Sequence, residues 1–448
     1  MRRRLAITVV AAAFLAVPGA AAQAASYTVR SGGGICGGGD IACGSVSAAA
    51  KAMRAGDDLT ISPGRYQESP RFEAPELLIR GSKIAPGVVI EGTVTFAATN
   101  GGASVLEKLV VRTSAAGAGA VLVTGLSGVS LRDASLFSAD GNALTITAAT
   151  ESAVTRSRLL AGAAAVAIGG GALRLDSSIL SGGAGAGGIG IAILAVPQEE
   201  LVLPLSVVAR HVTIAGAPIA IAMTGSGDPA PSAKVSDSIV LGAAEPAVAF
   251  TRTDRESDPA ALFVNPQTRN FRLRSGSPAL DRGQTTPGES STDIDGQPRT
   301  LGKASDLGAD ELDTVAPRVT ITRPRGGQTL GADSRLRLAG QAQDPSGVTS
   351  VVFSLEVLPR SGATCNWFDP VRALVNRSCS DPVLVRAPVA KGGAWSFNGP
   401  PGLALPAGRY RVSVSGTDRF GVTGNTAPAA LRTIAFSVRR SAAVTSKP

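Results

Sequence analysis

Aromatic residues and histidine are scarce in this chain of 448 residues. Phe, Trp and Tyr together make up 4% of it, and His occurs once, as His211. Proteins that bind nucleic acid concentrate basic charge, and those that bind single strands interleave it with stacking rings. The basic residues here are dispersed, so we expect no nucleic-acid partner. A single His also argues against a His-ligated zinc site.

Cysteine is limited to four residues in two local pairs, Cys36 with Cys43 and Cys365 with Cys379. These spacings do not fit a CxxC redox motif or a zinc site. In an exported chain, which enters an oxidising space, nearby Cys residues form disulfides by default. We therefore predict two disulfides, one within each pair.

Long apolar runs are missing beyond the N-terminus. Residues 1–24 combine Arg2, Arg3 and Arg4 with a short apolar stretch and an Ala-Gln-Ala site at 22–24, which predicts a secretory signal peptide. No later run reaches the roughly 18 apolar residues of a transmembrane helix. We expect a secreted protein, with possible attachment to the cell surface left open. Without the three Arg of the signal peptide, the chain has 40 of its 43 basic residues against 34 acidic ones, a net charge near +6. So mild a charge gives only a weak preference for an acidic polysaccharide or cell wall.

Short apolar strands recur through residues 100–251, at intervals of 22 to 29 positions between Val121, Leu144, Val166, Ile191, Ile219 and Val248. The first line of strands is AVLV (120–123), ALTI (143–146), AVAI (165–168), GIAI (190–193), PIAI (218–221) and AVAF (247–250). A second line alternates with it: EKLVVRT (107–113), DASLFSA (133–139), RSRLLAG (156–162), DSSILSG (176–182), RHVTIAG (210–216) and DSIVLGA (237–243). Helical periodicity is absent, so each period predicts one coil of a solenoid with two or three strands.

The N-terminal stretch YTVRSGGGICGGGDIACGSVSAAAKAMRAGDDLTISPGRYQES and these coils resemble the right-handed parallel β-helix of secreted, pectate-lyase-like (pectin lyase-like) proteins. The resemblance implies an all-β solenoid over residues 25–312, with the helix-prone stretch from Ser45 to Ala55 covering its apolar end. Similar lyases hold Ca²⁺ on outward-facing carboxylates and use an Arg as a base. The coils show no dense carboxylate cluster for Ca²⁺, so we expect no cofactor.

The stretches NFRLRSGSPALDRG (270–283) and DIDGQPRTLGKASDLGADEL (293–312) look like the choice-of-anchor Q domain that ends such β-helices, and predict a C-terminal capping segment over 263–312. The signature positions implied by this resemblance are Ser277, Pro278, Asp281, Gly283, Asp293, Asp295, Gly296, Asp306 and Gly308. Asp carboxylates accept backbone N–H bonds in tight turns and Gly permits positive φ, so a structural role is the simpler reading.

Beyond Leu312 the chain alternates apolar and polar residues between turn clusters and resembles a bacterial immunoglobulin-like sandwich over 316–438, with a disordered tail at 439–448. We expect the Cys365–Cys379 pair to staple a long loop. Modules of this kind serve as spacers or weak binders.

Charged residues recur at the head of the second line of strands: Glu107, Asp133, Arg156, Asp176, Arg210 and Asp237. Asp176, Arg156, Arg210 and Asp237 are the candidate catalytic residues, because Asp176 would lie between two Arg in stacked coils. The competing interpretation is a salt-bridge ladder that holds the coils in register, worth about 0.2–1 kcal/mol per pair. His211, and Glu199 and Glu200 in the insertion 195–205, are weaker candidates.

Two functions remain open. The first is a non-enzymatic surface protein, expected to be monomeric, with a structural, carbohydrate-binding or adhesion role. The second is a polysaccharide lyase or glycoside hydrolase acting on acidic glycans. Because one fold hosts many activities, the coils alone do not decide between them.

Overall fold

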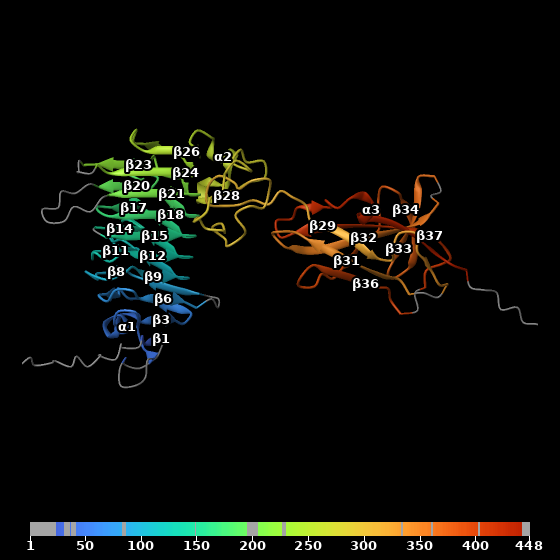
Figure 1. The fold of residues 1–448 in the computed structure, drawn as a ribbon, viewed down its shortest axis with the longest axis horizontal. Coiled ribbons are helices and arrows are strands. Elements are labelled where there is room, and N and C mark those ends of the chain that lie inside the picture. Colours follow the sequence, from blue (N-terminus) through green and yellow to red (C-terminus); the bar gives the residue numbers. More distant parts are fainter. Residues whose placement is uncertain are drawn as a thin grey trace, which may run out of the picture.

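The computed structural model describes residues 24–440, except 31–35, 37–41, 83–86, 148, 195–204, 226–229, 333–334, 360–361 and 402–403. The predicted signal peptide up to residue 23, Glu199, Glu200 and most of the predicted tail therefore lie outside the described residues. The predicted fold class is confirmed: a parallel β-solenoid is followed by a β-sandwich (Figure 1).

Each coil of the solenoid contributes strands to three columns, and every column is parallel. The first column holds β1 (Ser26–Val29), β3 (Asp58–Ile61), β6 (Leu78–Gly81), β9 (Ser104–Glu107), β12 (Val129–Arg132), β15 (Glu151–Thr155), β18 (Ala172–Asp176), β21 (Ser206–Arg210) and the start of β24 (Ser232–Val240). The second holds β4 (Gly64–Tyr66), β7 (Val88–Glu91), β10 (Val110–Thr113), β13 (Ser135–Ser138), β16 (Arg158–Ala161), β19 (Ile179–Ser181), β22 (Thr213–Ile214) and the end of β24. The third holds β5 (Arg71–Phe72), β8 (Val94–Phe96), β11 (Val121–Val123), β14 (Leu144–Ile146), β17 (Ala164–Ile168), β20 (Ile189–Leu194), β23 (Ile219–Thr224) and β25 (Ala243–Ala244).

The first predicted line of strands is the third column, and its register is correct over four coils. Val121 pairs with Leu144, Leu144 with Val166, and Val166 with Ile191. Ile191 pairs with Ile221 and not with the predicted Ile219. A shift of two residues keeps the same face of the strand, so a run such as PIAI does not distinguish the two registers. The last member, AVAF, was wrongly placed: it leads into β26 (Ala249–Asp254), which pairs with β24 on the other sheet.

From β9 to β24, a two-residue corner joins the first column to the second in successive coils. Its first residue has a φ between 45 and 57° in six successive coils: Lys108, Asp133, Arg156, Ser177, His211 and Asp237. The N–H of Arg156 donates to the Asp176 carbonyl, and the N–H of Ser177 donates to the Arg210 carbonyl, so the corners stack. Left-handed backbone is rare for residues other than Gly, and here it repeats because the stacked coils hold it in place.

The N-terminal end of the tube is covered by α1 (Val46–Ala52). The hydroxyl of Ser45 accepts the Ala48 N–H at 3.0 Å and caps this helix. Val46 and Ala49 pack into the apolar core of the coils. Beside the helix, β2 (Ala42–Cys43) pairs with β1 and carries the Cys36–Cys43 disulfide.

The segment after β26 lies along the flank of the coils and not over the open end of the tube. It contains α2 (Pro259–Leu262), β27 (Phe263–Asn265), η1 (Pro266–Thr268), β28 (Asn270–Leu273) and the irregular stretch 274–312. Phe263 and Phe271 meet edge to face at 5.2 Å between ring centroids. They share a small core with Ile179 and Ile239 of the coils, so the flank is buried by this segment.

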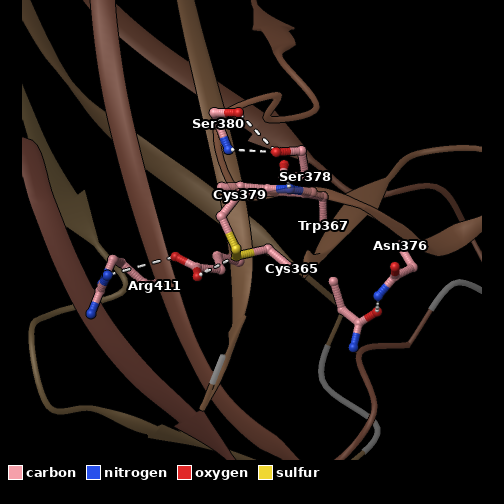
Figure 2. Close-up of a disulfide and its surroundings, with 9 residues drawn as sticks. Cys365, Trp367, Asn376, Ser378, Cys379, Ser380 and Arg411 are labelled. Atoms are coloured by element: carbon pink, nitrogen blue, oxygen red, sulfur yellow. Dashed lines mark hydrogen bonds and ion pairs between the residues drawn. A yellow bond between two sulfur atoms is a disulfide. The ribbon is translucent and has the colours of Figure 1, made fainter. Parts of the chain in front are cut away.

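The sandwich contains a three-stranded and a larger sheet. The first is β29 (Arg318–Arg323), β31 (Arg337–Gln343) and β36 (Ala394–Asn398). The second is β30 (Thr329–Leu330), β39 (Thr433–Val438), β37 (Gly408–Asp418), β32 (Val348–Leu358), β33 (Thr364–Asp369), β34 (Ala373–Ser378), β35 (Val385–Ala387) and β38 (Thr423–Gly424), with α3 (Ala429–Arg432) before β39. The Cys365–Cys379 disulfide was predicted to staple a loop. It instead fastens the open end of the hairpin β33–β34, which extends the sheet (Figure 2).

Candidate functional site

The charged residues of the predicted column occupy two adjacent positions rather than one. Asp133, Arg156 and Asp237 are corner residues with positive φ. Asp176 and Arg210 precede the corner by one residue and are register partners on the adjacent strands β18 and β21. Glu107 has the corresponding place in β9. The predicted register is therefore wrong by one residue for Glu107, Asp176 and Arg210.

Two of the candidates form bidentate ion pairs with neighbouring coils. Arg156 donates to both carboxylate oxygens of Asp133 at 2.7 and 2.8 Å. Arg252 donates to both carboxylate oxygens of the buried Asp237 at 2.6 and 2.8 Å. Paired guanidinium and carboxylate groups of this kind hold two coils in register and are the stronger form of charged hydrogen bond.

The stretch 284–292 contacts all four candidate residues, and Arg210 keeps 42% of its side chain exposed. The N–H of Gln284 donates to Asp237 at 2.9 Å, and the N–H of Ser290 donates to Asp176 at 2.7 Å. Arg156 donates to the Thr292 hydroxyl at 3.4 Å. Arg210 forms an ion pair with Glu289 at 3.4 Å. The candidates thus face the predicted capping segment rather than an open groove.

His211 is buried at a corner, where its Nε2 lies 3.3 Å from a carboxylate oxygen of Glu289. Burial, and then the charge of Arg299, lower the pKa of His211. One ligating atom each of His211, Asp237 and Glu289 lie within 4.8 Å of one another. A cation would fit poorly here, because Arg252 already pairs with Asp237 and Arg210 with Glu289.

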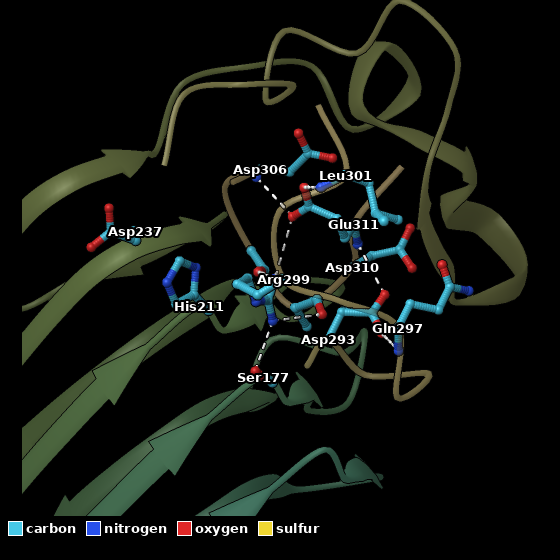
Figure 3. Close-up of polar contacts among 12 residues, drawn as sticks. Ser177, His211, Asp237, Asp293, Gln297, Arg299, Leu301, Asp306, Asp310 and Glu311 are labelled. Carbon is cyan, nitrogen blue, oxygen red and sulfur yellow. Dashed lines mark hydrogen bonds and ion pairs between the residues drawn. The ribbon is translucent and has the colours of Figure 1, made fainter. Parts of the chain in front are cut away.

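Arg299 is the central residue of this interface, and no sequence pattern distinguished it from other arginines. Its side chain is 2% exposed and donates to the Ser177 hydroxyl at 2.7 Å (Figure 3). It also donates to the carbonyls of Gly308 and Ala309 at 3.1 and 3.2 Å. Glu311 lies 3.9 Å away and supplies an opposite charge. Burial lowers the pKa of Arg299, so this guanidinium is held by its acceptors in a poorly solvated site.

Three buried carboxylates of the same segment accept backbone N–H groups. Asp293 accepts from Asp295, Gln297 and Glu311. Asp306 accepts from Asp281 and Leu312, and Glu311 accepts from Leu301 and Asp306. Burial raises the pKa of Asp293 to about 6, of Asp306 to about 7 and of Glu311 to about 8, while these donors oppose the rise.

The other signature positions lie in the turns of the same segment. Asp281 accepts the N–H groups of Lys303 and Ala304 at 2.6 and 3.1 Å. Asp295 pairs with Arg272, and the Ser277 hydroxyl accepts the N–H of Ala279. The remaining positions are Pro278, whose carbonyl accepts from Arg282, Gly283, whose N–H donates to the Ser305 carbonyl, Gly296, with a φ of 77°, and Gly308, with a φ of 93°. At Gly308 a side chain would also meet Thr213 and Ile239 of the coils.

Two of the hollows on the described surface lie away from this interface. One, of about 480 Å³, lies between the coils and α2 and is lined mostly by small apolar residues, with Phe271 and Arg269. The other, of about 450 Å³, lies on the sandwich and brings Arg411 and Arg432 together with Glu356 and Trp367. Glu356 is 2% exposed and pairs with Arg411 at 3.6 Å (Figure 2). Trp367 is 5% exposed, so its ring is not free to stack on a ligand.

A scan against protein-family models, a search of curated proteins and a search of solved structures each find no match. Along the described part of the chain, no helix is long and apolar enough to cross a membrane.

Proposed function

We propose that this chain is an exported, non-enzymatic surface protein in which a rigid β-solenoid supports a glycan-contacting β-sandwich. On this proposal the coils form the right-handed β-helix of the pectate-lyase-like proteins. The segment 263–312 is then a choice-of-anchor Q type element, and the sandwich is of the bacterial immunoglobulin-like type. The two disulfides agree with an oxidising compartment outside the cell.

The observation that carries the proposal is the contact between residues 284–292 and the charged column. A general acid or base must reach the proton that it transfers, within hydrogen-bond distance or through one water. Asp176, Arg210 and Asp237 instead contact Ser290, Glu289 and Gln284. These contacts favour the salt-bridge and register role over the catalytic one.

The hollow on the sandwich supports the carbohydrate-binding part of the proposal. Arg411 keeps 39% of its side chain exposed beside the buried Glu356, and Arg432 lies on the same rim. A planar guanidinium binds carboxylate groups in bidentate fashion, which suits the uronate units of an acidic glycan. Hydroxyls of Ser354, Ser413 and Thr433 line the same hollow and offer further hydrogen bonds.

Turnover is tested by incubating the purified full-length chain with polyuronates and neutral glucans, with and without Ca²⁺. Ultraviolet absorbance reports the unsaturated products of a lyase, and new reducing ends report a hydrolase. We expect neither signal above a heat-denatured control. Activity that disappears in Asp176→Asn and in Arg210→Gln, while both variants stay folded, would overturn the proposal in favour of a polysaccharide lyase or glycoside hydrolase.

Binding is tested separately by affinity electrophoresis in gels that contain polygalacturonate or a neutral glucan. We expect retardation by polygalacturonate only, and its loss in Arg411→Ala together with Arg432→Ala. Arg409→Ala is the matched control, because Arg409 is exposed on the same strand, β37, outside the hollow. Retardation that survives the double change would place the glycan contact elsewhere, and no retardation by any glycan would leave a purely structural protein.

A further inference from the structure

Three aspartates meet where the solenoid segment enters the sandwich. Asp313 lies in the connection before β29, Asp344 in the turn between β31 and β32, and Asp418 at the end of β37. One carboxylate oxygen of each lies within 4.8 Å of the corresponding oxygens of the other two. Three stretches of chain, far apart in sequence, therefore bring negative charge to one point.

Each carboxylate uses one oxygen to hold its own loop. Asp313 Oδ1 accepts the Val315 N–H at 2.8 Å, and Asp418 Oδ1 accepts the N–H groups of Phe420 and Val422 at 2.8 and 2.9 Å. Asp344 Oδ1 accepts both the N–H and the hydroxyl of Ser346. The three side chains are therefore fixed in position by their turns.

The second oxygens of Asp313 and Asp418 have no such partner. Both Oδ2 atoms are buried and accept no hydrogen bond within the described structure, and the two residues are 1% and 2% exposed. A buried carboxylate oxygen without a donor is costly to the fold. The sandwich ion pairs Arg377–Asp381 and Arg411–Glu356 do not involve these three aspartates.

The electrostatics of the cluster point the same way. Burial raises the pKa of Asp313 to about 6, hydrogen bonds from Val315 and Ser346 oppose the rise, and the charge of Asp344 and a hydrogen bond with its side chain add to it. Burial also raises the pKa of Asp418, again with a contribution from Asp344. Without a counter-charge, the protein thus gathers carboxylates that repel one another in a poorly solvated place.

We propose that Asp313, Asp344 and Asp418 bind a calcium ion. The ligands are all hard oxygen atoms, with no Cys or His among them, which favours Ca²⁺ over zinc or copper. Calcium takes six to eight oxygens, so backbone carbonyls and water would complete the shell around the carboxylates. The ion would satisfy both orphaned oxygens and cancel most of the charge.

The site would couple the connection to the sandwich. Asp313 follows Glu311 and Leu312 of the capping segment, whereas Asp344 and Asp418 belong to turns of the sandwich. An ion shared by the three would fix the connection against the sandwich and stabilise the folded state by mass action. This inference does not depend on the glycan-binding proposal.

Calcium binding is tested on the full-length chain after removal of divalent ions with EDTA. Isothermal titration with CaCl₂ is expected to show one site, with a Kd of about 10⁻⁴ to 10⁻³ M, the range of extracellular calcium modules. Asp313→Asn and Asp418→Asn should each weaken binding at least tenfold. Asn keeps an oxygen for the loop hydrogen bonds, so these variants are designed to fold.

Asp369→Asn is the matched control, because Asp369 Oδ1 also holds a turn of the sandwich, through Val371 and Arg372, away from the cluster. Thermal unfolding supplies a second readout. Calcium should raise the Tm of the wild type and of the control but not of the two cluster variants. In EDTA, the cluster variants should be at least as stable as the wild type, because a repulsive charge is gone. Absence of heat at 10-fold the upper limit of that Kd range, or calcium binding that survives both cluster changes, would overturn the proposal.

Discussion

Arg299 donates to the Ser177 hydroxyl at 2.7 Å, and this contact joins a corner of the coils to a segment 122 residues further along the chain. Ser177 in turn donates to the Thr292 carbonyl at 3.1 Å. The flank of the solenoid and the segment 281–311 therefore share one buried polar network. The network is not fully satisfied, because Arg299 Nε and His211 Nδ1 are buried without a hydrogen-bond partner in the described structure.

Changing Arg299→Met should lower the free energy of unfolding by about 3–5 kcal/mol, because it leaves buried carboxylates without their cation. Urea denaturation, followed by circular dichroism, measures the change. Arg282→Met is the control, since Arg282 is exposed and donates to the Pro278 carbonyl at 3.3 Å. Equal stability of the two variants would show that Arg299 carries no special share of the interface.

Stability should fall as pH rises from 6.5 to 8. Burial holds the pKa of Asp306 at about 7 and of Glu311 at about 8, well above the ordinary values near 4 of the unfolded chain. The folded state thus binds more protons in this window, and the free energy of unfolding decreases with pH. His211 acts in the opposite sense, but only below its unfolded pKa of about 6.5.

The measurement is the Tm at several pH values in calcium-free buffer. Glu311→Gln should flatten the decline, because the group that titrates highest is gone. A wild-type Tm that rises between pH 6.5 and 8 would contradict the raised pKa values of these two residues.

The left-handed corners should reject β-branched residues. Lys108 has a φ of 57°, and replacing it with Val should lower the free energy of unfolding by about 1–3 kcal/mol through backbone strain. Lys108→Asn should be nearly neutral, since Asn tolerates this region. Arg112→Val is the control on the adjacent strand β10, where Val suits the extended backbone. The prediction fails if Val is tolerated equally well at both positions.

Removing the hairpin disulfide should destabilise the sandwich. Cys365 and Cys379 are 14 residues apart, and a loop of about this size corresponds to roughly 3 kcal/mol of lost chain entropy. The double change Cys365→Ser with Cys379→Ser should therefore lower the midpoint of sandwich unfolding in guanidinium. Cys36→Ser with Cys43→Ser, which opens a separation of only 7 residues, should have a smaller effect on its own domain.

The repeat was readable from the sequence because short apolar runs mark the third column directly. Val121, Leu144 and Val166 stack as the spacing indicated. The strands of the first column were harder to recognise, since Ser130, Ala153 and Arg174 lie on them and weaken the pattern. The last coil was misplaced because β25 is only two residues long.

The candidate site was less predictable, because its partners come from a distant segment. Asp176 and Arg210 are register partners on adjacent coils, as the predicted stacking implied. Nothing in their local sequence shows that residues 284–292 contact them. Arg299 lies in the turn-rich stretch QPRTLG, where a buried guanidinium has no periodic signature. Asp313, Asp344 and Asp418 each resemble an ordinary turn residue, and only the fold brings them together.

The stacked corners also limit how this protein can change in length. Successive corner residues from Lys108 to Asp237 are 21 to 34 positions apart, yet each of these corners is two residues long. Differences in coil length are therefore absorbed on the other sides of the coils. Along this flank, corresponding positions of successive coils are about 4.8 Å apart. The hydrogen bonds between the segment 281–311 and the row of corners extend from Arg156 to Asp237. A coil gained or lost between those two residues would shift the corners out of register with the segment and break these contacts, whereas a coil added before Asp133 would leave them intact. Growth of the rod is thereby restricted to its N-terminal half.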